Sequence, residues 1–221
     1  MFDRSRPSLC FVHDADSAEP PGELWKLPDE VWSEVDMVQI RGKDLEAGEL
    51  ESLVEGWIDR LTDFDTLVVV NDRVDVALAA EADGVHLGQE DAPLKETREE
   101  VDEEFVIGGS SHTRDELLIA QARGADYAGL GAFFESETKP DAERLDPWRG
   151  ALMEHIPALV IPVLAIGGLT PDRVGDAFRV PAVTGVAASA AIQRADDPAA
   201  VIEAFRDALN RAWDARVETR V

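Results

Sequence analysis

The sequence has a single cysteine, Cys10, and lacks any apolar run long enough to cross a membrane. One thiol cannot form an internal disulfide, and its place within an apolar run predicts a buried core residue. Residues 1–7 also lack the apolar stretch of a secretory signal peptide. These absences predict a cytoplasmic protein without a membrane partner.

Positive charge is scarce, because 21 lysines and arginines stand against 46 aspartates and glutamates, for a formal net charge of −25. Nucleic acid carries charge of the same sign and would be repelled, so no nucleic-acid partner is expected. The acids are spread along the whole chain rather than gathered in a tail. They fit adaptation to high salt, where screening removes the self-repulsion, or an acidic interaction surface, and we favour the first.

Short apolar runs recur along the chain, and segments with helical spacing lie between them. Eight runs have the length and composition of strands buried on both faces. They cover residues 9–12, 37–40, 67–70, 84–87, 105–108, 127–130, 163–166 and 183–188. Eight strand–helix units in a chain of 221 residues predict an α/β fold, a single (β/α)8 TIM barrel over residues 1–221.

The first strand–helix unit fits this pattern least. Residues 14–31 should hold its helix, but a Pro-Pro-Gly sequence at 20–22 interrupts it. We therefore expect a degenerate unit with a loop and a short or displaced helix. At the other end, amphipathic spacing predicts a final helix over 198–216, and the charged residues 214–221 are expected to fray.

Acidic side chains follow two neighbouring strands of the predicted barrel. Asp72 comes directly after the third run, and Asp91 follows the fourth. Ligands bind at the carboxyl ends of the strands in such barrels, so we expect these carboxylates to converge. Two carboxylates together suit a hard divalent cation and a phosphorylated substrate. For Asp72 alone, capping of the following helix is an equal alternative.

Cationic and amide side chains end the second run. Alternation along an extended chain places Gln39, Arg41 and Lys43 on one side, where they suit a phosphate or pyrophosphate. A solvated loop is the plainer alternative for such a pattern. Asn71 ends the third run beside Asp72, and we expect Arg73 and Asp75 to form a structural pair at the start of the next helix.

Hydroxyl groups follow the fifth run, at Ser110 and Ser111, where they could contact an anion or a polar ring or cap a helix. His112 could act as an acid or base, although a lone histidine is more often structural. His86 lies inside the fourth run, and we expect it in the core or behind the site rather than as a metal ligand.

Segments suited to a phosphate follow the last three runs. Ser136, Thr138 and Lys139 predict a mobile lid that closes on phosphate. A glycine pair ending at Gly168 lets backbone amides approach an anion, and Ser189 follows the eighth run. The loops after strands seven and eight form the frequent phosphate site of this barrel class.

Six motifs, in order over roughly residues 35–205, resemble the thiamine-phosphate synthase family. They are 38–44 (Val-Gln-Ile-Arg-Gly-Lys-Asp), 71–75 (Asn-Asp-Arg-Val-Asp), 82–91 (Ala-Asp-Gly-Val-His-Leu-Gly-Gln-Glu-Asp), 107–112 (Ile-Gly-Gly-Ser-Ser-His), 138–140 (Thr-Lys-Pro) and 165–168 (Ala-Ile-Gly-Gly). The resemblance implies a transferase in which hydroxymethylpyrimidine pyrophosphate loses pyrophosphate to give a pyrimidine-methyl cation. The nitrogen of thiazole phosphate captures this cation to form thiamine phosphate.

The resemblance also implies a Mg²⁺ cofactor held by Asp72 and Asp91. The residues that it implies as catalytic are Arg41, Lys43, Asn71, Ser110 and Lys139. Those that it implies as substrate-binding are Gln39, Arg41, Lys43, Asn71, Ser110, Ser136, Thr138, Lys139, Gly168 and Ser189. Two of the four lysines in the chain fall on these positions, which a solvated surface does not explain.

Three departures from the family pattern leave alternatives open. Ala190 stands where the family often has serine, Glu135 replaces a proline near the predicted lid, and the first unit is degenerate. The chain could thus be a paralogue resembling the related thiazole tautomerases, or a non-catalytic binder of thiamine intermediates. Ala132 argues against tautomerase chemistry, because those relatives usually carry histidine there. Assembly into a homo-oligomer is compatible with the sequence.

Overall fold

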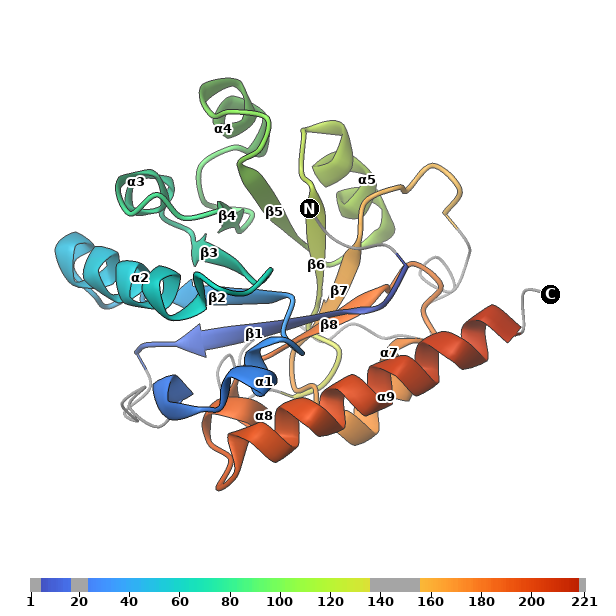
Figure 1. The fold of residues 1–221 in the computed structure, drawn as a ribbon. Coiled ribbons are helices and arrows are strands. Elements are labelled where there is room, and N and C mark those ends of the chain that lie inside the picture. The colour runs from blue at the N-terminus through green and yellow to red at the C-terminus, as the bar shows by residue number, and fades with distance from the viewer. Residues whose placement is uncertain (1–4, 17–23, 136–155, 219–221) are drawn as a thin grey trace.

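The computed structural model describes residues 5–16, 24–135 and 156–218. Its centre is a closed barrel of eight parallel strands, as the sequence predicted (Figure 1). The strands are β1 (Ser8–Asp14), β2 (Met37–Arg41), β3 (Leu67–Asn71), β4 (Gly84–Leu87), β5 (Val106–Ser111), β6 (Tyr127–Gly131), β7 (Val163–Ile166) and β8 (Gly185–Ala188). The fifth runs from 106 to 111 rather than 105 to 108, and the eighth begins at 185 rather than 183.

Pairing of β8 with β1 closes the barrel, with Cys10 opposite Ala187. On its other side, β1 pairs with β2, and Cys10 lies opposite Met37. Such closure leaves no unpaired strand edge, so the strand ends are held in a fixed ring. This ring places the polar residues that follow the strands at one end of the barrel.

Helices surround the barrel, as Figure 1 shows. They are η1 (Leu24–Lys26), α1 (Asp29–Trp32), α2 (Ala47–Leu61), α3 (Val74–Ala79), α4 (Leu94–Glu100), α5 (Arg114–Ala122), η2 (Pro171–Arg173), α7 (Val174–Ala177), α8 (Ala190–Gln193) and α9 (Pro198–Glu218). Between β1 and β2, the described residues contain only the short helices η1 and α1. Helix α9 extends to Glu218, two residues beyond its predicted end at 216. None of the described helices has the length and apolarity of a membrane span.

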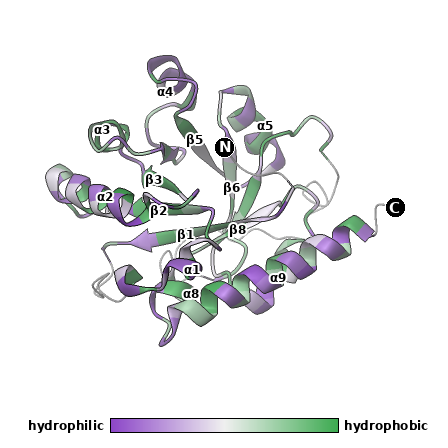
Figure 2. Cartoon of the chain, in the orientation of Figure 1, coloured by the Kyte–Doolittle hydropathy of each residue, from purple (hydrophilic) through white to green (hydrophobic). Residues whose placement is uncertain are grey.

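Helix α2 shows how the sequence makes these elements. Glu46 and Glu49 form a reciprocal capping box at its start, which satisfies amide groups that the first turn leaves without partners. Leu50, Val54 and Trp57 recur at helical spacing and are buried against the barrel. Figure 2 shows the resulting alternation of hydrophilic and hydrophobic residues along α2 and α9.

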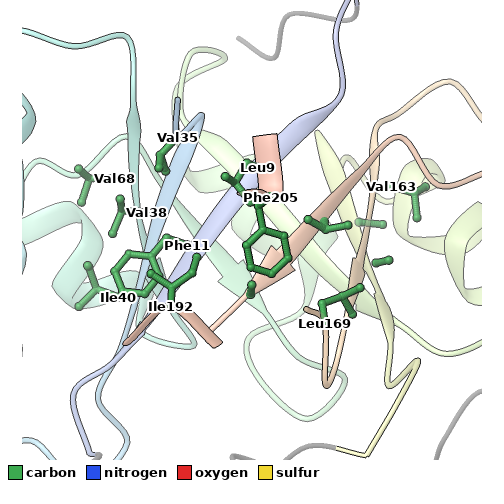
Figure 3. Packing of buried hydrophobic residues seen from close by; sticks show 14 of the residues in the cluster. Leu9, Phe11, Val35, Val38, Ile40, Val68, Val163, Leu169, Ile192 and Phe205 are labelled. Carbon is green, nitrogen blue, oxygen red and sulfur yellow. The ribbon is translucent and has the colours of Figure 1, made fainter. Parts of the chain in front are cut away.

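The core has two layers because side chains alternate along each strand. Cys10 and seven other buried residues form the layer inside the barrel. Leu9 and Phe11 instead point outward to the helices, where Phe205 of α9 packs beside them (Figure 3). Complete burial of a side chain such as Phe205 contributes about 1.5–3 kcal/mol. Cys10 is buried, which confirms that it is a core residue, and this burial raises the pKa of its thiol.

Candidate functional site

A cavity of about 430 Å³ lies at the carboxyl ends of the strands. Ends of β2 to β5 contribute one part of its wall, and ends of β6 to β8 contribute the other. Six of the predicted substrate-binding residues line it: Gln39, Arg41, Asn71, Ser110, Gly168 and Ser189. Lys43, Asp72 and Asp91 are not among the described lining residues, although Asp72 directly follows Asn71. Ser136, Thr138 and Lys139 lie outside the described residues.

The wall formed by β2 and β3 carries a network of polar side chains. Gln39 Nε2 donates to Asn71 Oδ1 at 2.9 Å, which joins two residues predicted to act together. Arg41 Nη1 lies 2.6 Å from Asp14 Oδ1 and 3.2 Å from Asp16 Oδ2. These two aspartates compensate the charge of Arg41 and fix its guanidinium group beside the cavity.

Asp16 also holds the loop after β2, because its carboxylate accepts from the amides of Lys43 at 2.8 Å and Asp44 at 3.0 Å. Sequence reasoning missed Asp14 and Asp16, since they fall where the chain reads as a degenerate loop. The alternation of β1 was an available signal: Asp14 continues the inward positions of Cys10 and Val12.

Asp72 and Asp91 do come together, since their carboxyl groups are within hydrogen-bond reach of each other. Burial, reinforced by the nearby Asp72, raises the pKa of the Asp91 carboxyl. Lys43 Nζ lies 2.9 Å from Asp72 Oδ2 and partly offsets this negative charge. The α3 helix begins after Arg73, whose side chain makes no capping bond, so Asp72 is not the N-cap of that helix.

The backbone conformation at Asp72 sets the direction of the Asp72 carboxylate. Its φ of 67° lies in the left-handed region, which aspartate adopts more readily than most residues. The Asp72 amide donates to His86 O at 2.8 Å and ties the turn to β4. Arg73 and Asp75 form the predicted structural pair, with Nε–Oδ1 at 2.9 Å and Nη2–Oδ2 at 2.7 Å.

The paired carboxylates fit a divalent cation that also binds a substrate. Like charges that converge in a partly buried place favour a cation between them, and the pKa of Asp91 is raised by burial first and by the neighbouring Asp72 second. Mg²⁺ typically takes one or two carboxylates and completes its shell with water and substrate phosphates. The described residues include no cluster of three or more His, Cys, Asp or Glu side chains that could hold a metal ion.

Beneath the cavity, a buried imidazole connects two hydroxyl groups. His86 Nε2 lies 3.0 Å from Ser110 Oγ, and His86 Nδ1 lies 3.0 Å from Tyr127 Oη. Gly108 makes room for this arrangement, because a Cβ there would lie 2.2 Å from Tyr127 and 2.5 Å from His86. His86 thus lies behind Ser110, as expected, and the serine is not a helix cap, since Thr113 caps α5.

His112, which was also predicted near β5, has a half-exposed side chain. Its Nδ1 lies 3.1 Å from Glu116 Oε2, and the same carboxylate oxygen accepts from the His112 amide at 2.7 Å. His112 lines the cavity but is oriented by the start of α5. This arrangement supports the structural interpretation of this histidine.

The wall near β7 and β8 includes Ser189, which was predicted to bind substrate. Strict alternation along β8 would point Ser189 away from the site. Ser189 nevertheless lines the cavity, and its buried Oγ has no hydrogen-bond partner among the described residues. The short α8 helix starts there and turns the backbone out of strand geometry. Ala190 and Glu135 also line the cavity. Sequence reasoning gave no role to Arg173 there, because a single arginine in a loop carries no pattern.

Known proteins with similar sequences and structures share this architecture. The sequence profile described as Thiamine monophosphate synthase matches residues 10–192. Thiamine-phosphate synthase from Chlorobium luteolum is 36% identical over 193 residues, 87% of this chain and 88% of that protein. Thiamine-phosphate synthase from Methanosarcina barkeri is 39% identical over 173 residues, which cover 77% of this chain and 77% of that protein. The solved thiamine phosphate pyrophosphorylase from Pyrococcus furiosus superposes with a TM-score of 0.80 at 28% identity, covering 95% of this chain and 98% of that one.

The matched segment runs from β1 through α8 and so contains both parts of the cavity wall. The similarity to the Pyrococcus furiosus structure extends over nearly the whole chain. The chain therefore belongs to the thiamine monophosphate synthase family and is a transferase of thiamine biosynthesis.

Proposed function

We propose that the protein joins hydroxymethylpyrimidine pyrophosphate to thiazole phosphate and releases pyrophosphate. The bond between the pyrimidine methylene carbon and the pyrophosphate oxygen breaks, and its electron pair leaves with pyrophosphate. The lone pair of the thiazole nitrogen then forms the new carbon–nitrogen bond. The observation that carries the proposal is one cavity in which Asn71, next to a pair of carboxylates, faces the same space as Gly168 and Ser189.

In this proposal the β2–β3 wall binds the pyrophosphate. Negative charge grows on the leaving group, so catalysis depends mainly on fixed positive charges and hydrogen-bond donors. Mg²⁺ bound to Asp72 and Asp91 would neutralise part of that charge. Arg41 and Lys43 add positive charge, and Asn71 orients the pyrophosphate. The contact between Asn71 and Gln39 holds both amide groups in place.

The same proposal assigns the pyrimidine and the thiazole phosphate to the rest of the cavity. Ser110 contacts the pyrimidine with its hydroxyl group, which His86 orients from behind. Gly168 and Ser189 receive the phosphate of the second substrate. Ser136, Thr138 and Lys139, which lie outside the described residues, are assigned to the same phosphate, and Lys139 also to the pyrophosphate.

The two alternatives predict different behaviour with the same substrates. A tautomerase-like paralogue would convert a thiazole phosphate tautomer without any pyrimidine, but Ala132 provides no acid or base on the cavity wall. A non-catalytic binder would bind the substrates and release no pyrophosphate. Retention of both carboxylates favours catalysis over these alternatives.

The deciding experiment mixes purified protein with both substrates and Mg²⁺, at low and at molar KCl. We expect thiamine phosphate to appear by mass spectrometry, together with one equivalent of pyrophosphate, and both to vanish when EDTA is added. Added Mg²⁺ should restore them. Protein that is folded and binds pyrophosphate but gives no product at either salt concentration would contradict the proposal and favour the non-catalytic binder.

We further infer a cytoplasmic enzyme adapted to high salt that folds as one domain. The closing pair of β1 and β8 supports the single domain, because the two ends of the described barrel depend on each other. The homo-oligomer stays a prediction, which the molar mass from light scattering during gel filtration tests.

A further inference from the structure

One guanidinium group on the cavity wall, that of Arg173, has no role in the proposed chemistry so far. Arg173 ends η2, directly after the turn that follows β7, and its side chain lines the cavity. Arg173 Nη1 donates to Gly168 O at 2.7 Å. Its Cζ also lies 4.9 Å from the centre of the Phe134 ring, in cation–π contact.

These two contacts immobilise the guanidinium group. The Phe134 ring contacts its carbon atom, and the carbonyl of Gly168 accepts from one of its N–H groups. A guanidinium group has five N–H donors, and only one of them has a partner among the described residues. The other donors are therefore held in place in advance, which lowers the entropy lost when they bind a ligand.

The backbone around Arg173 is built to hold this position. Gly167 and Gly168 have φ values of 96° and 61°, in the region that glycine adopts without strain. A Cβ on Gly168 would lie 2.1 Å from Glu135 O, so the segment after β6 packs directly on the turn. The Phe134 amide donates to Gly167 O at 3.0 Å and locks the two segments together.

The groups on this wall favour a fixed cation as the partner of an anionic ligand. Glu135 adds a carboxylate to the cavity lining, and Ala190 provides no hydroxyl group. A phosphate that entered this part of the cavity would meet the negative charge of Glu135. A planar cation with paired N–H donors offsets that charge and matches the geometry of phosphate oxygens.

We infer that Arg173 is a specificity-determining residue that binds the phosphate of the second substrate through the donors that Gly168 does not use. The inference rests on the proposed function for the identity of this ligand. Arg173 thereby supplies binding that Ala190, which has no hydroxyl group, cannot supply. It distinguishes thiazole phosphate from the same thiazole alcohol without its phosphate.

The test compares Arg173→Met, Arg173→Lys and the control Arg179→Met. Arg179 is exposed, and its Nη1 lies 3.6 Å from Asp176 Oδ1. For Arg173→Met we expect the KM for thiazole phosphate to rise about 10- to 100-fold, as for a lost charge-assisted hydrogen bond. The KM for the pyrimidine pyrophosphate should stay within about twofold. Arg173→Lys should fall between the parent and Arg173→Met, and the control should match the parent.

Calorimetric binding of thiazole phosphate and of the thiazole alcohol tests the inference without turnover. The parent should prefer the phosphorylated ligand, and Arg173→Met should lose that preference while its melting temperature stays near that of the parent. Equal weakening of both ligands, or an unchanged preference for phosphate, would overturn the inference. A parent protein that binds thiazole phosphate in this way but makes no product would refute the proposed function alone.

Discussion

His86 Nε2 lies 3.0 Å from the hydroxyl oxygen of Ser110 on the cavity wall. On its other side, His86 Nδ1 lies 3.0 Å from Tyr127 Oη, inside the barrel core. Burial raises the pKa of the Tyr127 hydroxyl well above its ordinary value, so that group keeps its proton. If Tyr127 donates this proton to Nδ1, His86 donates from Nε2, and the hydroxyl proton of Ser110 is directed to the substrate.

This chain of contacts predicts that Tyr127→Phe weakens catalysis through Ser110. The kcat/KM for the pyrimidine substrate should fall about tenfold, the usual effect of one lost hydrogen bond. The same substitution in a Ser110→Ala background should have almost no effect, because the group that it orients is gone. Steady-state kinetics of the four proteins measure this coupling. Equal losses in both backgrounds would show that Tyr127 acts independently of Ser110.

The carboxylate pair predicts the outcome of Asp91→Ala. Removing one of two carboxylates should abolish Mg²⁺-dependent turnover, by at least about 100-fold, while the barrel remains folded. The rate as a function of Mg²⁺ concentration, with circular dichroism as a check of folding, measures this. Asp75→Ala, which breaks an exposed pair with Arg73, is the matched control and should keep its activity. Normal turnover in Asp91→Ala would refute the metal assignment.

Position 190 predicts a gain of binding. Ala190→Ser should add a hydroxyl group to the cavity lining beside Ser189 and lower the KM for thiazole phosphate by about fivefold, as expected for one neutral hydrogen bond. The KM for the pyrimidine pyrophosphate should not change. Substrate titrations of the parent and the variant measure both values. A KM for thiazole phosphate that is unchanged or higher would count against this account of the β8 end.

The burial of His13 predicts that the stability of the fold depends on pH. It is fully buried beside Phe11 and Trp57, and burial lowers its pKa from 6.5 to about 4. The unfolded chain therefore binds more protons than the folded one below about pH 6.5. The free energy of unfolding is therefore unaffected by His13 above that pH. It declines as the pH falls towards 4, by up to about 3 kcal/mol.

Replacing this histidine tests the sign of the effect. His13→Leu should remove the loss of stability that His13 causes between pH 6.5 and 4.5. The free energy of unfolding of the variant, minus that of the parent, should therefore grow as the pH falls. Urea denaturation at a series of pH values measures it. A difference that is constant over this range would show that His13 does not cause the decline.

The net charge of −25 predicts a response to salt. Molar KCl screens the repulsion among the acidic side chains, so the melting temperature should rise by several degrees with a single transition. Sodium sulfate and KCl at equal ionic strength separate screening from general salt effects on burial. A melting temperature that falls in molar KCl would refute adaptation to high salt, and two separate transitions would contradict a single domain.

The positions of the strands and of the cavity could be predicted because both follow from local patterns. Apolar runs located β1 to β8 within a few residues, and the polar residue after each run identified the end of the barrel that carries the site. The position of Ser189 on the cavity wall could not be predicted in this way. Alternation assumes that the strand continues, and the α8 helix starts at that residue instead.

The contacts between distant residues also could not be predicted. Asp14 and Arg41 are far apart in sequence, and only the pairing of β1 with β2 makes them neighbours. Tyr127, His86 and Ser110 lie on three different strands, so their contacts depend on the stagger of the barrel. The close approach of these side chains requires Gly108, because any larger residue there would collide with them. The sequence alone gives no sign of this requirement.

The sequence by itself determined the barrel class, the family resemblance and the residues that carry polar chemistry at the strand ends. These properties depend on which residues follow which, and a linear pattern contains that information. Only the tertiary structure decided which cations are paired, that Arg41 faces two aspartates, and that Arg173 is held by Gly168 and Phe134. Electrostatic and hydrogen-bond energies depend on distances between atoms, and barrel closure sets those distances for residues far apart in the chain.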